Sequence, residues 1–477
     1  MTTAAAQSGR DATLSPSDLC GRRVTVMGLG RFGGGGGAAR FLIERGARVT
    51  LTDLQTEDEL HESLVQLAPC SPAAIHLGGH READFRDTDL IVVNPAVPPD
   101  NRFLQIARAA GVPLTSEIRL FWQLNRGRVI GVTGSNGKST TAALIHSLLM
   151  SAGFTSHLGG NIGRSLLPIV DQIQPDDWVV LELSSFQLED LDKITVRPDV
   201  AVVTSFSPNH LDRHGTIGAY RRAKQTLLRY QRSDDVAVLN RDDEDIAGWN
   251  VRGRTLWFGT TDDGRDGVFA VAGRLRIRND QGKTRQLPDI AADRLPGEHN
   301  RLNIAAAIAA AAAVGASEET VPDGIERFAP LPHRLEFIAE ISRREFYNDS
   351  LATTPESTVA AIRAFSRPIV LLAGGSDKQI DLAPLAEAIT RECKAVALMG
   401  ETGRVLAELI AALPGSATIS RHVCRSLAEA FDWACGQSAA GDVVLLSPGC
   451  ASYDWFRNFS DRGHQFVRLV QERPEIP

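Results

Sequence analysis

The sequence predicts an α/β protein of three domains built on mainly parallel sheets. Short β-branched strands alternate with helical segments along nearly the whole chain, which is the pattern of parallel sheets. At two places, 23–45 and 129–149, such a strand runs into a glycine-rich turn and then into a helix. The length of 477 residues suits about three domains of ordinary size.

Composition and charge indicate what kind of protein this is and which kinds of binding partner it disfavours. With 43% hydrophobic and 23% charged residues the chain reads as a soluble globular protein. Its net charge of −7 argues against nucleic acid or an anionic membrane as the main partner. The six cysteines show no CxxC pair, which predicts free thiols in a reducing cytoplasm. The longest apolar run, 304–314, is about half a membrane span, so we expect a buried helix there.

Residues 1–20 are rich in Ala, Thr and Ser and have no apolar core. This composition is typical of neither a signal peptide nor an anchor, and we expect a disordered tail.

The first domain, expected at 21–126, opens with a GxGxxG turn between a strand and a helix. The turn is Gly28-Leu29-Gly30-Arg31-Phe32-Gly33, and the second strand ends at Asp53. We take Gly28, Gly30, Arg31, Phe32 and Asp53 as ligand candidates. The fingerprint needs only a diphosphate at the helix N-terminus and a sugar hydroxyl near the acidic residue. A nicotinamide or flavin nucleotide and a UDP-sugar therefore both remain open.

The second domain, expected at 127–330, opens with a phosphate loop. The strand 129–132 leads into Thr133-Gly134-Ser135-Asn136-Gly137-Lys138-Ser139-Thr140. Lys138 would reach the terminal phosphates of a nucleotide and Ser139 would ligate magnesium. The strict motif has Gly where Val132 stands, so Gly134 and Gly131 must offer the flexibility at shifted positions. The backbone candidates are Gly134, Ser135, Asn136, Gly137 and Thr140.

Further polar groups follow the next strands of this domain. Glu182 ends an apolar strand, where a carboxylate needs a partner or a cation. It either binds magnesium or caps the turn at Ser184-Ser185. The segment 207–214, which includes His210, is dense in groups that ligate metals or contact phosphates. The basic helix 218–230, which includes Lys224, taken alone reads as a solvated face.

The remaining chain reads as hairpins, an Ala-rich helix, a linker and a third domain. We expect hairpins in 260–288. Asn300 and Asn303 could cap the Ala-rich helix or bind a base edge, and sequence alone favours the cap. After a Pro-rich linker, the third domain at 331–477 again alternates strands with helices.

Seven motifs in this order resemble those of the Mur ligases, in the branch that adds glutamate to UDP-N-acetylmuramoyl-L-alanine. The resemblance covers nearly everything after Cys20. The run 182–189 separates this branch from other Mur ligases and from folylpolyglutamate synthases. The seven segments are 133–140, 159–163, 182–189, 209–214, 332–334, 348–350 and 447–452.

The resemblance implies a Rossmann-like UDP-binding domain, a P-loop ATPase-like central domain and a Rossmann-like glutamate-binding domain. The implied enzyme uses ATP to make an acyl phosphate and then adds D-glutamate, in cytoplasmic peptidoglycan precursor synthesis. Two Mg²⁺ ions are implied, one on Ser139 and Glu182 and the other on His210. Lys224 matches a lysine that the family carries as a carbamate formed from CO₂.

The resemblance also implies roles for other residues. Asn161 would lie near the substrate and the γ-phosphate. The adenosine and phosphate positions are Asn300, Asn303, Arg334 and Asp349. The glutamate positions are Thr353, Lys378, Ser452 and Phe459. We expect small-molecule substrates, no nucleic-acid or membrane partner, a monomer, and closure of the third domain onto the second.

One position departs from the family. Leu351 stands where a lysine is usual, which keeps L-glutamate open as the amino acid. The alternative from another class is an NAD-dependent oxidoreductase with an incidental phosphate loop.

Overall fold

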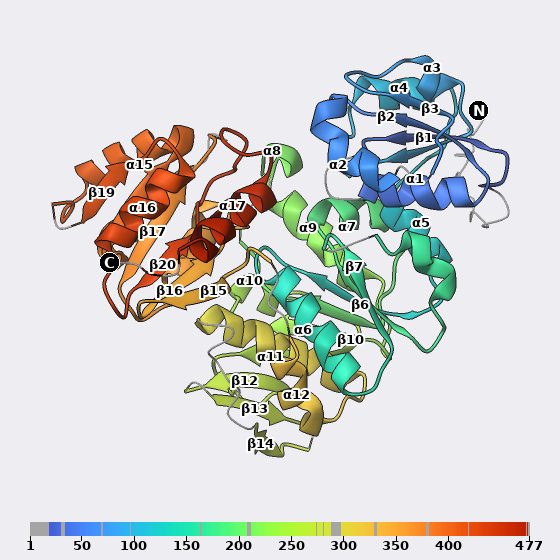
Figure 1. Ribbon diagram of the computed structural model, residues 1–477. Coiled ribbons are helices and arrows are strands. Elements are labelled where there is room, and N and C mark those ends of the chain that lie inside the picture. The colour runs from blue at the N-terminus through green and yellow to red at the C-terminus, as the bar shows by residue number, and fades with distance from the viewer. Residues whose placement is uncertain are drawn as a thin grey trace, which may run out of the picture. The chain divides into compact units, whose positions relative to one another are not determined.

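Three sheets with their helices make up the chain in a computed structural model (Figure 1). The structure describes 19–29, 34–67, 70–95, 97–162, 165–207, 211–272, 274–279, 281–287, 297–328, 332–377, 381–417, 419–473 and 475. The chain divides into two compact units, Met1–Leu287 with Ala305–Ile325, and Pro288–Ile304 with Glu326–Pro477. Most of the tail expected to be disordered lies outside the described residues.

The first sheet is parallel throughout, in the order β3-β2-β1-β4-β5. Its strands are β1 (Arg23–Met27), β2 (Arg48–Thr52), β3 (Ala74–His76), β4 (Leu90–Val93) and β5 (Leu114–Thr115). Its helices are α1 (Gly34–Glu44), α2 (Glu57–Leu67), α3 (Ala83–Arg86), α4 (Arg102–Ala109) and α5 (Glu117–Leu124). The order reverses at β1, so the loops after β1, β2 and β4 meet at one edge, the usual ligand position of such sheets.

The second sheet has the order β14-β13-β12-β11-β10-β9-β6-β8-β7. Its strands are β6 (Arg128–Thr133), β7 (Ser156–Gly160), β8 (Trp178–Glu182), β9 (Val200–Val203), β10 (Val236–Asn240), β11 (Arg254–Gly259), β12 (Gly267–Val271), β13 (Arg274–Arg278) and β14 (Thr284–Gln286). The strands from β7 to β12 are parallel, and β12, β13 and β14 pair antiparallel, which confirms the expected hairpins. Because β6 lies between β8 and β9, the phosphate loop, Glu182 and the segment after β9 meet.

The α-helices that accompany the second sheet include a short one directly before the basic helix. They are α6 (Lys138–Ser151), α7 (Ser185–Leu191), α8 (Leu211–His214), α9 (Ile217–Arg229), α10 (Glu244–Ala247), α11 (Glu298–Ala313) and α12 (Val321–Glu326). Short 3₁₀ segments lie at Leu167–Gln172, Asp192–Ile194 and Glu318–Thr320. Residues Ala305–Ala310 of α11 are at most 1% exposed, which confirms a closely packed helix. Among the described helices, none is both long and apolar enough to cross a membrane.

The third sheet has the order β15-β16-β20-β17-β18-β19, parallel except for the β15–β16 pair. Its strands are β15 (Glu336–Ile341), β16 (Arg344–Asn348), β17 (Ile369–Gly374), β18 (Ala395–Met399), β19 (Ser420–Val423) and β20 (Val443–Leu446). Its helices are α13 (Pro355–Ile362), α14 (Ala383–Glu392), α15 (Gly400–Ala412), α16 (Leu427–Gln437) and α17 (Phe459–Gln471). Neighbouring residues Val370 and Leu371 belong to different core clusters, so apolar side chains cover both faces of this sheet.

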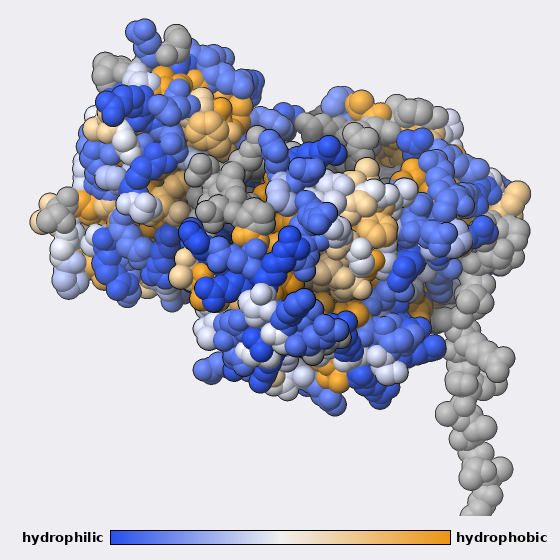
Figure 2. Space-filling model, turned by 90° about the horizontal axis from the view of Figure 1, so that it is seen from below, coloured by the Kyte–Doolittle hydropathy of each residue, from blue (hydrophilic) through white to orange (hydrophobic). Residues whose placement is uncertain are grey.

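The architecture confirms the predicted α/β class with three sheets. All six cysteines are free thiols, as expected. Hydrophilic residues cover most of the face seen in Figure 2, and apolar residues show there in patches between them.

Candidate functional site

The phosphate loop joins β6 to α6, and glycines shape its backbone. Gly134 has φ 153°, and a Cβ on it would lie 2.0 Å from Thr204 Oγ1. Gly137, with φ 81°, stands at the N-cap of α6. Both conformations are easily accessible only to glycine. Gly134 therefore provides the freedom that the shifted pattern required, and the loop runs directly into a helix N-terminus, which favours anions.

The end of β9 supports this loop. The Ser135 amide donates to Ser205 O at 2.7 Å and the Asn136 amide to Ser205 Oγ at 2.9 Å. Thr204 Oγ1 donates to Asn136 O at 2.5 Å. Sequence reasoning missed Thr204 and Ser205, because the sheet order β8-β6-β9 alone brings them to the loop.

Two lysines converge on one carbonyl of the loop. Lys138 Nζ donates to Gly134 O at 3.0 Å and to Ser135 O at 2.9 Å. Lys224 Nζ donates to Gly134 O at 2.6 Å, and this residue is 1% exposed. Burial holds the pKa of Lys224 well below its usual value, and the charge of Lys138 adds to the effect, while Glu182 opposes it. The solvated-face interpretation of helix 218–230 is therefore wrong at Lys224.

Glu182 lies at the end of β8, close enough to Lys224 to affect its pKa, and it is 2% exposed. Its Oε1 accepts from Asn161 Nδ2 at 2.9 Å, and its backbone carbonyl accepts from Asn161 N at 2.8 Å. Its Oε2 is buried and has no hydrogen-bond partner among the described residues. Ser184 caps α7 itself in a capping box with Gln187, so the alternative in which Glu182 caps the turn is wrong.

A divalent cation fits this arrangement. A buried carboxylate oxygen without a donor is costly, and a hard cation such as Mg²⁺ takes oxygen ligands of this kind. Ser139, the other expected ligand, is half-buried in the first turn of α6. His210 lies outside the described residues. Within the described part of the chain, no three His, Cys, Asp or Glu side chains gather in a metal-binding group.

The backbone of α1 lies close to the end of β1. A Cβ on Gly35 would lie 2.3 Å from Gly28 O, so the close approach of the two backbones requires glycine at this position. Gly28 N donates to Thr52 O at 2.8 Å. Asp53 is 7% exposed at the end of β2, and its Oδ1 accepts from Gln55 N at 3.0 Å. The candidates Gly30, Arg31 and Phe32 lie outside the described residues.

In the second unit, Arg334 lies close to Asp349 and His299. Asp349 accepts from Leu335 N at 3.1 Å and from Ser447 Oγ at 2.7 Å. Burial raises the pKa of Asp349 to about 6, and the charge of Arg334 opposes this. Burial also lowers the pKa of His299 to about 4, and Arg334 adds to that shift.

Asn300 and Asn303 are buried and joined to each other. Asn303 Nδ2 donates to Asn300 Oδ1 at 3.1 Å. Because α11 begins at Glu298, neither residue stands at its N-cap, and the cap interpretation favoured from sequence is wrong.

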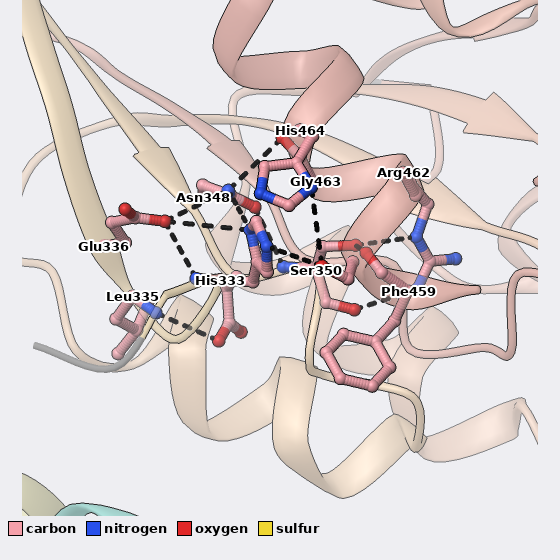
Figure 3. A network of polar contacts seen from close by, with 11 residues as sticks. His333, Leu335, Glu336, Asn348, Ser350, Phe459, Arg462, Gly463 and His464 are labelled. Atoms are coloured by element: carbon pink, nitrogen blue, oxygen red, sulfur yellow. Dashed lines mark hydrogen bonds and ion pairs between the residues drawn. The ribbon is translucent and has the colours of Figure 1, made fainter. Parts of the chain in front are cut away.

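The turn Asn348–Ser350 is bound to the first turns of α17 (Figure 3). Ser350 Oγ donates to Phe459 O at 2.7 Å. Arg462, 0% exposed, donates to Ser350 O at 2.9 Å and to Cys450 O at 3.2 Å. Two of the glutamate positions thus lie next to this bonded turn, since Phe459 begins α17 and Ser452 follows Cys450 closely.

Thr353 and Lys378 are the other two glutamate positions. Thr353 is half-buried in the loop before α13. Lys378 lies outside the described residues. Leu351, at the position that departs from the family, donates its backbone N–H to His333 O at 2.9 Å.

Three family descriptions match successive parts of the chain. A Mur ligase MurD-like N-terminal domain matches residues 22–116, a Mur ligase middle domain 132–311, and a Mur ligase glutamate ligase domain 333–450. Solved structures at low identity share the fold. A MurC ligase from Thermotoga maritima is 19% identical with a TM-score of 0.64, covering 94% of this chain and 99% of that one. A MurF ligase from the same organism, solved with ADP, is 18% identical with a TM-score of 0.59, covering 95% and 98%.

Curated relatives match over nearly the full length. A protein of Roseiflexus sp. strain RS-1 is 40% identical over 465 residues, covering 95% of this chain and 99% of its own length. A protein of Symbiobacterium thermophilum is 39% identical, covering 94% and 98%. Both carry the name UDP-N-acetylmuramoylalanine–D-glutamate ligase. The chain belongs to the Mur ligase family, in the group of its UDP-N-acetylmuramoylalanine–D-glutamate ligases.

Proposed function

We propose that this chain is an ATP-dependent ligase that joins D-glutamate to UDP-N-acetylmuramoyl-L-alanine, in peptidoglycan precursor synthesis. The observation that carries the proposal is the meeting of the phosphate loop with Glu182, whose Oε2 has no hydrogen-bond partner in the described chain. A hydride-transfer enzyme has no use for a phosphate loop that meets a buried carboxylate. The names of the near full-length relatives supply the substrates.

The first step makes the carboxylate reactive, because its oxygen is a poor leaving group. The alanyl carboxylate oxygen forms a bond to the γ-phosphorus while the bond from that phosphorus to the β,γ-bridging oxygen breaks. ADP leaves and an acyl phosphate remains. Lys138, now bonded to carbonyls of its own loop, exchanges them for phosphate oxygens and stabilises the charge that spreads over them. Asn161, whose Nδ2 donates to Glu182 Oε1, would lie near the substrate and the γ-phosphate.

The second step forms the amide bond. The amine of glutamate attacks the acyl carbon, gives a tetrahedral intermediate and expels phosphate, and the amine loses a proton. Lys378 would pair with a glutamate carboxylate and Ser452 would donate a hydrogen bond to it. Thr353 and Phe459 complete this site.

Ser139, Glu182 and His210 would hold two Mg²⁺ ions, which would neutralise phosphate charge in the first step. Lys224 would join them as a carbamate. The amine nitrogen bonds to the carbon of CO₂ and releases a proton, so a cation becomes an anion. Only the neutral amine reacts in this way, and burial together with Lys138 favours that form of Lys224.

The remaining roles follow the same domain plan, with boundaries near 126 and 330. The first domain would bind the UDP moiety through Gly28, Gly30, Arg31, Phe32 and Asp53. The second and third would bind ATP through the phosphate loop and through Asn300, Asn303, Arg334 and Asp349. We further propose a cytoplasmic monomer whose third domain closes during the reaction.

The test is phosphate release from ATP with Mg²⁺ and UDP-N-acetylmuramoyl-L-alanine, adding D-glutamate last. Release that requires both substrates is the expected result. Leu351, at the family's lysine position, makes L-glutamate the necessary second arm. Release with L-glutamate alone would overturn the choice of enantiomer. No release with either, together with an absorbance change at the nicotinamide band, would overturn the ligase.

A further inference from the structure

The segment 204–207, which follows β9, supports the phosphate loop, and we call it the supporting segment. Its first two residues make the bonds to Ser135 and Asn136 described above. Ser207 adds two more, because its N–H donates to Ser135 Oγ and its carbonyl accepts from that hydroxyl, both at 2.9 Å. The position of the supporting segment therefore sets the position of Ser135 and Asn136 in the loop.

The end of β10, the strand that pairs with β9, holds the supporting segment from another side. Asn240 is the last residue of β10 and is 7% exposed, and its Nδ2 donates to Thr204 O at 2.8 Å. Its Oδ1 accepts from Asp242 N at 2.9 Å. The Asn240 amide is therefore fixed in one orientation, with its donor on the supporting segment.

Asp243 holds the same segment two residues further on. Its Oδ2 accepts from Phe206 N at 2.6 Å. Its Oδ1 accepts from Ile246 N at 3.1 Å and so caps α10. A carboxylate can only accept, and here each of its oxygens has a backbone N–H. Asp243 therefore joins the start of α10 to the supporting segment.

The side chain of Phe206 reinforces this arrangement. Its ring stacks on Tyr220 with centroids 5.5 Å apart, and it meets Trp249 edge-on at 5.8 Å. The Tyr220 hydroxyl in turn lies 3.1 Å from Ser135 Oγ. The supporting segment is thus fixed through its main chain and through a side chain, on the side of α10 and on the side of the loop.

We propose that Asn240 and Asp243 are positioning residues of the phosphate loop, which affect nucleotide binding through the supporting segment. Each acts on backbone atoms of that segment. The inference rests on the proposed function in taking this loop as the site of the ATP phosphates. Backbone N–H groups bond a phosphate oxygen well only at about 2.7–3.2 Å. A small displacement of the loop therefore weakens several contacts together.

The main test variant is Asp243→Ser in the full chain. Serine is as good an N-cap as aspartate, so it keeps the bond from Ile246 N. Its single oxygen, on a shorter side chain, cannot also hold Phe206 N. The change removes a negative charge near a polyphosphate site, which by charge alone would strengthen nucleotide binding. Loss of positioning predicts weaker binding, so the two effects have opposite signs.

The matched control is Asp242→Ser, which removes the neighbouring carboxylate. Asp242 Oδ2 accepts from Thr260 N at 2.7 Å, directly after β11, and so serves another part of the chain. Asn240→Leu is a second, uncharged test variant of similar volume that removes the donor to Thr204 O. Near-ultraviolet circular dichroism checks the fold of each variant, and Asn240→Leu carries the test if Asp243→Ser does not fold.

The readout is the dissociation constant of ADP with Mg²⁺, measured by calorimetry. We expect Asp243→Ser and Asn240→Leu to bind ADP at least about tenfold more weakly than wild type, the loss of about one hydrogen bond to a charged group. Asp242→Ser should stay within about threefold of wild type. In turnover, KM for ATP should rise in both test variants while KM for glutamate stays unchanged.

ADP binding by Asp243→Ser that is as tight as in wild type, or tighter, would overturn the proposal. An equal loss in Asp242→Ser would do the same, because it would mark a general disturbance of the turn after β10. Wild-type protein that binds no ADP would overturn both the inference and the proposed function. Weaker ADP binding in the test variants, with no phosphate release from wild type, would support the inference and overturn only the proposed reaction.

Discussion

Replacing Gly463 by alanine tests whether α17 packs so closely against the His333 ring that only glycine fits at position 463. Gly463 lies inside α17, and a Cβ on it would lie 2.3 Å from His333 Nδ1 and 2.7 Å from His333 Cγ. In an unobstructed helix this change stabilises by about 1 kcal/mol. Whether Gly463→Ala stabilises or destabilises the chain therefore depends on whether the His333 ring can move away from the new methyl group.

His333 has little room to move (Figure 3). It is 4% exposed, and its Nδ1 accepts from Asn348 Nδ2 at 2.8 Å. Its Nε2 lies 3.2 Å from Ser460 Oγ. Displacing the ring leaves Nδ1 as a buried acceptor without a donor, which costs about 1–3 kcal/mol, and overpacking costs about 1–3 kcal/mol more. After the helix gain of about 1 kcal/mol, we expect a net destabilisation of about 1–5 kcal/mol.

The assay is native-state hydrogen exchange of amides in β16 and α17, which reports the opening free energy of this part of the chain. The control is the same change in a His333→Ala background, where the new methyl group finds space. There Gly463→Ala should stabilise by about 0.5–1 kcal/mol. The reasoning is refuted if Gly463→Ala does not destabilise the wild-type background, or destabilises both backgrounds equally.

Three further predictions concern Lys138, Lys224 and the acid stability of the second unit. Lys138→Ala should lower kcat for phosphate release about 10²- to 10³-fold, because one donor to the transferring phosphate is lost; a variant within about threefold would contradict this role. Lys224→Ala should be nearly inactive, and wild-type activity should fall in CO₂-free buffer and return with bicarbonate; normal turnover by the variant would refute the carbamate. Burial lowers the pKa of His333 to about 4, below its value of about 6.5 in the unfolded chain. The stability that neutral His333 gives is therefore complete above pH 6.5 and is lost as the pH falls towards 4, by roughly 3 kcal/mol. Asp349, with its pKa raised to about 6, acts in the opposite direction over the same range. Hydrogen exchange of β16 at pH 7 and pH 5, corrected for intrinsic rates, should show a smaller acid loss in His333→Gln, and an equal loss would contradict this assignment.

Sequence patterns were sufficient to predict those features that depend only on residues close together in the chain. The phosphate loop could be predicted because a strand, two glycines and Lys138 are contiguous, and its backbone geometry follows from them. The alternation of strands and helices gave the three-sheet class, and the Ala-rich run gave a buried helix. These features depend on residue order over short stretches.

Other features depended on which strands lie side by side. Lys224 belongs to a helix that looks solvated by composition, yet it is 1% exposed because α9 places it beside the phosphate loop. Asn300 and Asn303 resemble caps, but the helix starts before them. Glu182 could have capped its own turn until Ser184 was seen to do so.

The sequence by itself therefore determined the fold class, the phosphate loop and the family of this protein, because short motifs and hydrophobic periodicity encode local backbone geometry. The tertiary structure alone decided that Ser205 supports the loop, that Asn240 and Asp243 hold the segment to which Ser205 belongs, and that Gly463 makes room for His333. Those contacts join residues that are far apart in the chain. Sheet order and helix packing set them, and no local pattern carries that information.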